Sequence, residues 1–422
     1  MSETLAARRR RALGDHVPTF YETPLHLVRG EGVWLWDASG RRYLDAYNNV
    51  PHVGHCHPHV TEAIARQAAT LNTHTRYLHD SIVAYVERLT ARLDHGLSQM
   101  LFTCTGSEAN DVALRMAQAA TGRTGLIATD NTYHGNTTAT AQLSTRRPPI
   151  GGYPSHVRLV PAPDSLHPVG GSRAGQAEAF AAHVAQAAAE LDAAGHGVSA
   201  MVICPAFANE GLPTLPPGFF APAEAALRAA GGLVICDEVQ PGFGRLGTAF
   251  WGHTRIGVAP DIVTLGKPMG NGHPVAGLVT RPELMGAFRR AFGYFNTFGG
   301  NPVSMAAAHA MLDVLEGEGL QENARRSGAH ALRRLAALDD ARIAEVRGQG
   351  LFFGVVLEAE DGSPATALAA DVVEGMRRHG VLAGRIGRHT NIIKMRPPMP
   401  FSTDHADRAV AALRAALREA AA

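Results

Sequence analysis

The sequence of 422 residues lacks the features that mark several other classes of protein. It has only four cysteines, widely spaced and without a C-x-x-C pair, which argues against a disulfide framework and fits a reducing compartment. No uncharged apolar run reaches about 18 residues, so we expect no membrane span. The arginine run at residues 8–11 has no apolar segment behind it and is no secretory signal, so we expect a cytoplasmic protein.

An excess of basic charge is also missing. Lysine and arginine together number 39, against 38 aspartates and glutamates. Proteins that bind polyanions usually carry a basic excess, so nucleic acid is not an expected partner. The apolar content of 45% is that of an ordinary globular chain, which argues against disorder.

The apolar runs alternate with helical patterns over most of the chain. From about residue 100, strands such as 100–104, 232–236 and 261–265 are separated by helices, which predicts an α/β fold with a doubly wound, mostly parallel sheet. Short strands at 22–45 precede this region, and we expect them to pack with a smaller α+β unit at the other chain end. The predicted division is 1–58 and 316–422 for the smaller domain, and 59–315 for the larger one.

A glycine-containing turn at residues 104–110 (CTGSEAN) joins a predicted strand to a predicted helix. Gly106 would let the backbone approach a ligand, and Ser107 would add a hydroxyl donor at the start of the helix. The free N–H groups and the dipole of a helix N-terminus suit a phosphate. A plain strand-to-helix turn with a serine cap is the alternative.

Two further strands end in ionisable residues. Residues 232–238 end in two carboxylates, and a buried carboxylate such as Asp237 needs a positive partner, unless it only caps the next loop. Lys267 ends the next strand, and a desolvated lysine can form a Schiff base, which arginine cannot. An exposed loop lysine is the commoner case, but the chain contains only two lysines, Lys267 and Lys394.

A phosphate turn, a carboxylate and an imine-forming amine together describe a site for pyridoxal 5′-phosphate. The sequence resembles the class III aminotransferase family of fold type I pyridoxal-phosphate enzymes from about residue 23 to residue 402. The segments that carry the resemblance are GHCHP (54–58), TGSEAN (105–110), TYHG (132–135), DEVQPGFGRLG (237–247), LGKPMGNGHPVAG (265–277) and NTFGGNP (296–302).

The resemblance implies a role for each matching residue. Lys267 would form the Schiff base and move protons, and Asp237 would pair with the pyridinium nitrogen. The remaining implied contacts to the cofactor are Gly106 and Ser107 at the phosphate, Tyr133 and Val239 on the ring faces, His134 beside Tyr133, Gln240 near the phenolic oxygen, and Thr297 at the phosphate of the neighbouring subunit. The active unit would therefore be a homodimer or a dimer of dimers.

Two reaction types share this machinery, transamination and elimination. Lys394 stands in the segment IIKMRPP (392–398), at a position where many members have an arginine that binds the substrate carboxylate. The residues of this segment resemble those of the ethanolamine-phosphate and phosphohydroxylysine phospho-lyase branch of the family. A phospho-lyase acting on a small amine is favoured, with Arg76, Arg385, Lys394 and Arg396 as candidate cations for a substrate phosphate. A transaminase remains the alternative because Glu210, which can pair with the carboxylate-binding arginine in transaminases, is present.

Four histidines, His52, His55, His57 and His59, lie close together in the sequence. Histidine is a common metal ligand, but these residues lack cysteine partners, and their spacing matches no closed zinc site. The GHCHP segment is part of the family resemblance, so we expect no metal here.

Overall fold

A seven-stranded sheet organises the larger part of the computed structural model, which describes residues 4–145 and 148–420. The strand order is β4-β10-β9-β8-β7-β5-β6, and only β10 runs against its neighbours. The strands are β4 (Gln99–Thr103), β5 (Gly125–Thr129), β6 (Val157–Val160), β7 (Val198–Ile203), β8 (Leu233–Asp237), β9 (Ile262–Leu265) and β10 (Ala276–Thr280). The predicted, mostly parallel sheet is confirmed.

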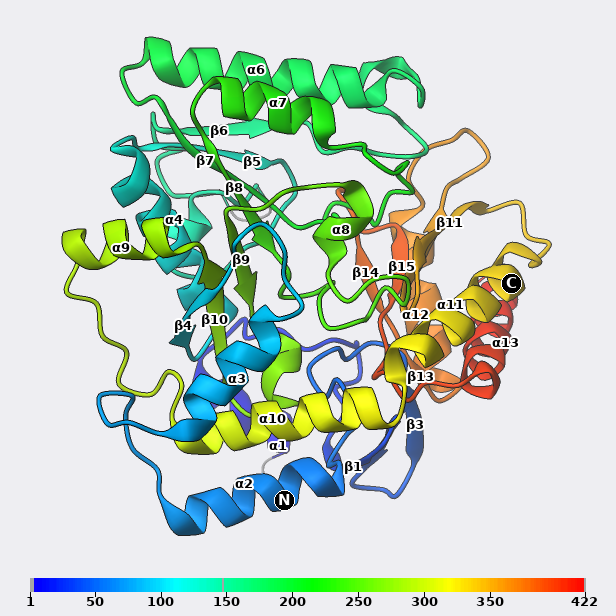
Figure 1. Ribbon diagram of the computed structural model, residues 1–422. Coiled ribbons are helices and arrows are strands. Elements are labelled where there is room, and N and C mark those ends of the chain that lie inside the picture. Colours follow the sequence, from blue (N-terminus) through cyan, green and yellow to red (C-terminus); the bar gives the residue numbers. More distant parts are fainter. Residues whose placement is uncertain (1–3, 146–147, 421–422) are drawn as a thin grey trace.

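Helices cover both faces of this sheet, because alternate residues of its central strands point to opposite sides. Met201 and Ile203 of β7 belong to a hydrophobic cluster with residues of α6 (Gln176–Ala193) and α7 (Ala221–Ala229), which lie at the top of Figure 1. Ala200 and Val202 belong to a second cluster, with residues of α4 (Gly106–Thr121) and α9 (Pro282–Ala291). The doubly wound arrangement is therefore confirmed as well.

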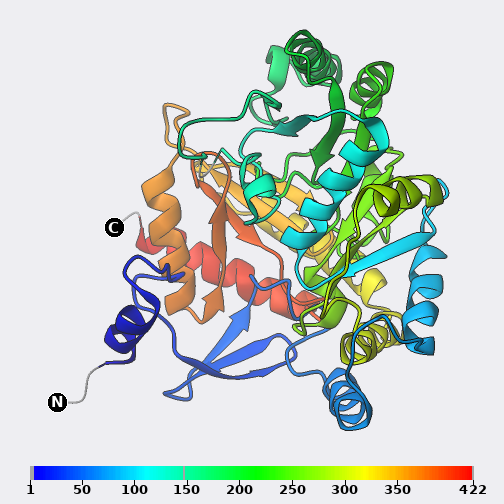
Figure 2. The same ribbon diagram turned by 90° about the vertical axis from the view of Figure 1, so that its left-hand side faces the viewer.

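The two ends of the chain meet in the smaller part, as the sequence predicts. Strand β3 (Arg42–Asp45) pairs in parallel with β13 (Val381–Leu382), with Leu44 opposite Val381. Figure 2 shows the blue N-terminal strands next to the orange and red C-terminal elements. The exact domain bounds stay a prediction.

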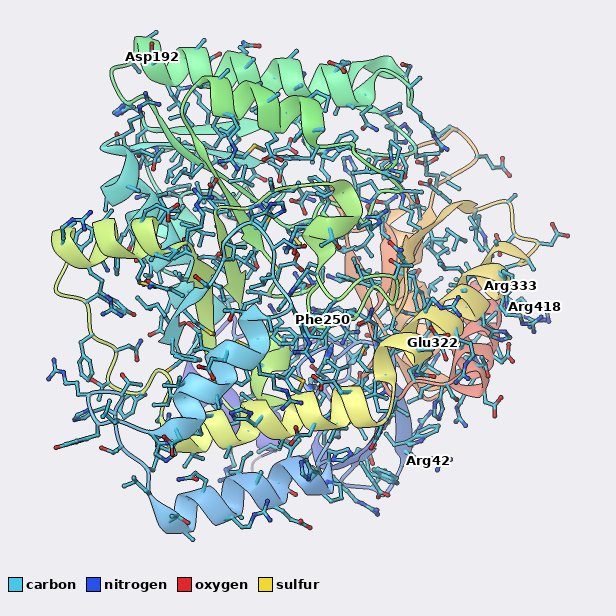
Figure 3. The ribbon with its side chains drawn as sticks, in the orientation of Figure 1. Arg42, Asp192, Phe250, Glu322, Arg333 and Arg418 are labelled. Atoms are coloured by element: carbon cyan, nitrogen blue, oxygen red, sulfur yellow. The ribbon has the colours of Figure 1, made fainter. Side chains whose placement is uncertain are left out.

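The rest of the smaller part consists of two sheets and three helices. The remaining strands are β1 (Leu27–Glu31), β2 (Trp34–Asp37), β11 (Ile343–Gln349), β12 (Phe352–Leu357), β14 (Gly384–Ile386) and β15 (Ile392–Met395), and the helices are α11 (Leu320–Ala336), α12 (Thr366–Arg378) and α13 (Thr403–Glu419). Arg333 of α11 and Arg418 of α13 point outward from these packed helices (Figure 3).

Other helices connect or flank the two parts. They are α1 (Leu5–Leu13), α2 (Pro58–Thr70), α3 (Asp80–Thr90), α5 (Thr138–Ala141), α8 (Gly252–Ile256) and α10 (Pro302–Gly317), with short 3-10 turns at Val169–Gly171 and Lys267–Gly270. None of the helices in the described part of the chain combines the length and the apolarity that a membrane crossing needs.

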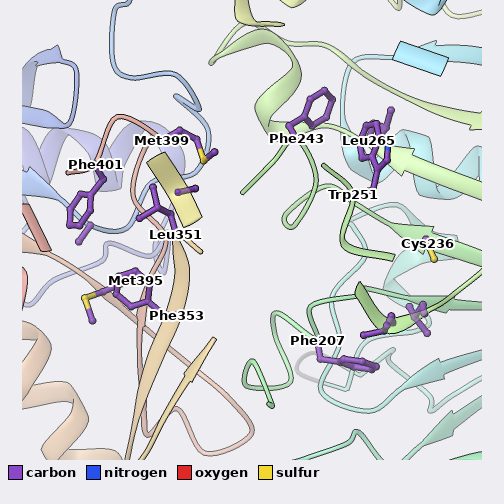
Figure 4. Packing of buried hydrophobic residues seen from close by; sticks show 14 of the residues in the cluster. Phe207, Cys236, Phe243, Trp251, Leu265, Leu351, Phe353, Met395, Met399 and Phe401 are labelled. Carbon is purple, nitrogen blue, oxygen red and sulfur yellow. The ribbon is translucent and has the colours of Figure 1, made fainter. Parts of the chain in front are cut away.

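One hydrophobic core continues from the larger part into the smaller. Figure 4 shows Phe243 and Trp251 on one side of the junction, and Leu351 and Met399 on the other. The fully buried Arg245 crosses the same junction, because its Nη1 donates to Leu351 O at 3.0 Å and to Pro397 O at 2.7 Å. This packing holds the C-terminal strands against the loops that follow β8 and β9.

We predict that Gly328→Ala weakens the packing of α11 against the turn between β11 and β12. A Cβ at Gly328 would lie 2.0 Å from Gly350 O, so the backbones would have to separate. Urea denaturation should show a free energy of unfolding lower by about 1–3 kcal/mol. Gly317→Ala in α10 is the matched control, because a Cβ there meets nothing within 4 Å. It should be neutral or stabilising by up to about 1 kcal/mol, and equal losses in both variants would contradict the packing argument.

Candidate active site

A cavity opens where the parallel strands of the large sheet end. Its walls come from the segments that follow β4, β5, β7, β8 and β9. Open α/β sheets place ligands at this edge, because the loops after neighbouring strands converge there. The cavity is lined by Gly106, Ser107, Asn110, Tyr133, His134, Gly135, Cys204, Asp237, Val239, Gln240 and Lys267.

The turn after β4 presents the N-terminus of α4 to the cavity. Thr105 is the N-cap, and its side chain forms a capping box with Glu108. This cap satisfies the N–H of Glu108 itself, and the Glu108 carboxylate accepts from the N–H of Thr105 at 2.9 Å. Gly106 lies against Val239, and a Cβ at Gly106 would fall 3.0 Å from Val239 Cγ2. The first amides of α4 and the dipole of the helix therefore face the cavity.

The segment after β5 closes over this turn. Gly135 has a φ of 146°, and a Cβ there would lie 2.7 Å from Ser107 Cα. The Ser107 hydroxyl accepts from the N–H of Asn136 at 3.1 Å, which leaves its own hydrogen for a ligand. Tyr133 is 40% exposed and donates to Asn136 Oδ1 at 2.8 Å. The two segments together form a cradle that suits a phosphate.

Asp237 is the buried carboxylate of the cavity and lies at the end of β8. Its Oδ2 contacts His134 Nδ1 at 2.7 Å and accepts from Asn110 Nδ2 at 3.0 Å, while Oδ1 accepts from the N–H of Val239 at 3.0 Å. Asn110 is itself held by Thr264, whose hydroxyl donates to Asn110 Oδ1 at 2.7 Å. These contacts fix the orientation of the carboxylate.

Lys267 follows β9 directly, and its amine is the nucleophilic group of the cavity. Burial lowers the pKa of Lys267 to about 8, and the positive charge of Arg396 acts in the same direction, while Asp237 opposes it. A lower pKa raises the fraction of neutral amine near neutral pH, and only the neutral amine attacks a carbonyl. The amine is therefore suited to Schiff-base formation.

Two cations hold the Gln240 amide at the side of the cavity. Gln240 Oε1 accepts from Arg396 Nη1 at 2.7 Å and from Lys394 Nζ at 3.4 Å. Arg396 Nη1 also donates to Asn49 Oδ1 at 2.7 Å, and Lys394 Nζ donates to Ala208 O at 3.4 Å. Because its oxygen is already engaged, Gln240 has its amide hydrogens left to donate to a ligand. Both cations are buried.

Three of the predicted residues are exposed and lie outside this cavity. Thr297 is exposed on the loop between α9 and α10. Arg76 is also exposed, and its guanidinium carbon lies 3.8 Å from the centre of the Phe295 ring, next to that loop. Arg385 is exposed on β14 and donates to Thr366 O at 3.4 Å. The cofactor contact that the resemblance implies for Thr297 and the substrate-phosphate contacts expected of Arg76 and Arg385 stay predictions.

Glu210 lines a second cavity behind the first. Its carboxyl accepts from the Thr129 hydroxyl at 2.7 Å and from the N–H of Asn209 at 3.0 Å.

Asn110 contacts Asp237 directly, and sequence reasoning assigned it no role. Its place one turn after Ser107 in TGSEAN could have suggested that it faces the same ligand.

The four neighbouring histidines have separate partners. His52 Nε2 lies 2.8 Å from Phe243 O, and His55 Nε2 lies 2.7 Å from Asp45 Oδ2. His57 and His59 contact Glu318 and Asp313. Across residues 4–145 and 148–420, no group of three His, Cys, Asp or Glu side chains is placed to hold a metal ion.

Comparison with known proteins gives consistent matches over nearly the whole chain. The aminotransferase class-III family model matches residues 18–417. An alanine–glyoxylate aminotransferase 2-like protein of Drosophila melanogaster is 40% identical over 425 residues, covering 96% of this chain and 85% of that protein. Ethanolamine-phosphate phospho-lyase homolog 1 of Caenorhabditis elegans is 35% identical over 436 residues, covering 97% and 92%.

A solved structure gives a similar match. A phospholyase from Arthrobacter in complex with phosphoethanolamine has a TM-score of 0.94 and 45% identity, covering 98% of this chain and 99% of that one.

The cofactor of this family is pyridoxal 5′-phosphate, and the residues present fit it. A phosphate would meet the N-terminus of α4 and Ser107. The close packing around Gly106 and Gly135 leaves no room for a side chain at either position. Asp237 supplies a fixed carboxylate for a protonated ring nitrogen, and Lys267 supplies the amine. The phosphate cradle, the carboxylate and the amine that the cofactor requires therefore line one cavity.

We predict that Lys267 titrates near pH 8 in protein from which the cofactor has been removed, because burial and Arg396 disfavour its charged form. The chain has only one other lysine, so competitive labelling with an amine reagent, read by peptide mass spectrometry, can follow Lys267 alone. Arg396→Met removes a positive charge and should move the midpoint to higher pH. Lys267→Arg is the control for peptide assignment, and an unchanged midpoint in Arg396→Met would contradict the electrostatic argument.

Proposed function

Because the chain belongs to the aminotransferase class-III family and is therefore a pyridoxal-phosphate-dependent enzyme, we propose that it is a phospho-lyase. The proposed reaction removes phosphate and ammonia from a small amine that resembles O-phosphoethanolamine. The phospho-lyase relatives and the phosphoethanolamine-bound phospholyase support this choice of substrate class.

The buried guanidinium of Arg396 beside the cavity carries the proposal. Arg396 is 8% exposed, and its guanidinium donates to the neutral amide oxygens of Asn49 and Gln240. Lys394 is 3% exposed and reaches the same Gln240 oxygen. The buried charge of Arg396 is costly unless an anion accompanies it for part of the cycle. A doubly charged phosphate next to the reacting carbon would supply that anion.

The chain's own groups can carry out the proton transfers of an elimination. When bound, the cofactor withdraws electrons from the substrate carbon that carries the nitrogen. Lys267, with a pKa lowered to about 8, would take the proton from that carbon. Phosphate would then leave the neighbouring carbon with the electron pair of its C–O bond, held by Lys394 and Arg396. Water would complete the reaction by releasing ammonia and the carbonyl product.

Amino transfer to a keto acid is the second candidate. The relatives named alanine–glyoxylate aminotransferase favour it, as does the retention of Glu210. However, the hydrogen bonds of Glu210 go to Thr129 and Asn209, and Lys394 stands at the position of the carboxylate-binding arginine. An arginine–glutamate switch for two different substrate carboxylates is therefore less well supported than a fixed site for one anion.

A second copy of the chain is proposed to cover the surface around Thr297 and Arg76. Large apolar side chains are exposed there, among them Phe298 at 70%, Tyr77 at 66% and Leu78 at 103%. Burying them against a partner would be favourable. A homodimer would bring Thr297, and with it Arg76, toward the neighbouring cavity.

We predict that incubation with O-phosphoethanolamine, without any keto acid, releases inorganic phosphate and ammonia in equal amounts. The measurement is a colorimetric phosphate assay with a coupled ammonia assay on the same sample. A parallel sample with alanine and glyoxylate tests amino transfer. Transfer of the amino group without phosphate release would reject the elimination and favour the transaminase.

We predict that Lys394→Met raises the KM for O-phosphoethanolamine at least tenfold, because one charge-assisted contact to the phosphate is lost. Lys394→Arg should keep the charge but lower the rate of phosphate release, since a guanidinium cannot reproduce the position of an ammonium. Arg385→Met is the matched control, because this exposed arginine donates to Thr366 O, whereas Lys394 contacts Gln240 of the cavity wall. Equal effects of the Lys394 and Arg385 variants would contradict the assignment of the anion site.

A further inference from the structure

The groups that hold the buried guanidinium of Arg396 are all neutral. Nη1 donates to Asn49 Oδ1 and to Gln240 Oε1, both at 2.7 Å. The guanidinium carbon lies 4.8 Å from the centre of the Tyr47 ring. Gly384 keeps this ring in place, because a Cβ there would fall 2.3 Å from Tyr47 Cε2. No carboxylate among the residues that the structure describes is paired with Arg396.

Other buried arginines of the chain are held differently. Arg347 is 1% exposed, and its guanidinium donates to the carboxylates of Asp164 and Glu345. Arg245 is fully buried and is held by backbone carbonyls at the junction of the two parts. Arg396 differs from both because side-chain amides hold it, and one of these amides belongs to the wall of the cavity.

The Asn49 amide is buried and only partly used. Asn49 is 1% exposed, its oxygen accepts from Arg396, and its Nδ2 has no hydrogen-bond partner. An unsatisfied buried donor costs free energy, and so does a buried charge that no anion accompanies. Asn49→Asp would remove the unsatisfied donors, keep an acceptor for Arg396 and neutralise its charge. The stability of the fold alone therefore does not explain an amide at this position.

We propose that Asn49 is a positioning residue that selects for an anionic substrate, because its neutral amide holds Arg396 in place and leaves the charge of the guanidinium to the substrate. The inference rests on the proposed function, in which the anionic group is a phosphate. A carboxylate at position 49 would compete with that phosphate for the same guanidinium. A doubly charged phosphate gains more from an uncompensated guanidinium than a neutral group does.

The same charge also acts on the amine of the cavity. The charge of Arg396 lowers the pKa of Lys267, in addition to the larger effect of burial. Neutralising Arg396 through Asn49 should therefore weaken the binding of an anion and raise the pKa of Lys267 together. A residue that only maintained the packing would not produce this pair of effects.

The test compares holoenzyme variants by their affinity for inorganic phosphate, from isothermal titration calorimetry, and by their KM for O-phosphoethanolamine. In the holoenzyme the phosphate of the cofactor occupies the cradle at the start of α4, so the added phosphate reports on the second anion site. Asn49→Asp should weaken phosphate binding and raise the KM by about tenfold or more. Asn49→Ala should weaken binding by only about threefold, because the charge of Arg396 remains.

Two further measurements separate the loss of charge from a loss of structure. The midpoint of thermal unfolding of Asn49→Asp should equal or exceed that of the wild type, because a buried charge gains a partner. In the cofactor-free protein, competitive labelling of Lys267 should show a midpoint at higher pH in Asn49→Asp. Asn48→Asp is the matched control, because the Asn48 side chain accepts from the N–H of Val50 at 3.3 Å and is not bonded to Arg396. It should resemble the wild type in every measurement.

Several outcomes would overturn the proposal. They are a wild-type holoenzyme that does not bind phosphate, an Asn49→Asp variant that binds it as the wild type does, an equal loss in Asn49→Ala or Asn48→Asp, and an unchanged Lys267 midpoint. If Asn49→Asp does not fold, Gln240→Glu places a carboxylate against the same Nη1, and phosphate binding retained there would contradict the inference. The calorimetry needs no turnover. A holoenzyme that shows the expected binding pattern but releases no phosphate from O-phosphoethanolamine would reject the proposed reaction alone.

Discussion

The Asp237 carboxylate and its hydrogen bonds are the interaction on which the site depends. A carboxylate buried at the end of a strand is unfavourable unless several donors hold it, and here His134, Asn110 and the N–H of Val239 do so. These donors come from three separate segments, so the strand ends must converge for the carboxylate to be stable. The same convergence brings Lys267 and the start of α4 to one cavity. Fold and site are thus parts of one arrangement.

The smaller part of the fold supplies a positive charge near the Lys267 amine. Arg396 follows β15, whose sheet contains elements from the end of the chain, and its N–H donates to Ala46 O beside the first sheet. Its guanidinium lowers the pKa of Lys267 and holds Gln240 with its hydrogens free for a ligand. The C-terminal strands therefore adjust the reactivity of a lysine that lies more than a hundred residues earlier.

Much of the fold and the centre of the site could be predicted from the sequence. Asp237 and Lys267 each follow an apolar strand directly, and Gly106 and Ser107 follow another, so local pattern and the general geometry of parallel sheets place them together. The roles of Asn110 and Glu210 could not be predicted in this way. Their partners, Asp237 and Thr129, are distant in sequence, and nothing local indicates which neighbour a polar side chain selects. Thr297 lies outside the cavity of its own chain, as its predicted contact with a neighbouring subunit requires. Arg76 and Arg385 were chosen for their charge, and charge alone does not indicate where an arginine lies.

The near absence of lysine has a chemical consequence for an enzyme whose cofactor is an aldehyde. Aldehydes condense with any accessible primary amine, and surface lysines ordinarily offer many such amines. Here one lysine lies in the cavity and the other is buried on β15, so the exterior is cationic almost entirely through guanidinium groups. Excess free cofactor would find few lysine side chains to modify. Arginine thus gives this surface its positive charge while sparing it from adventitious adducts.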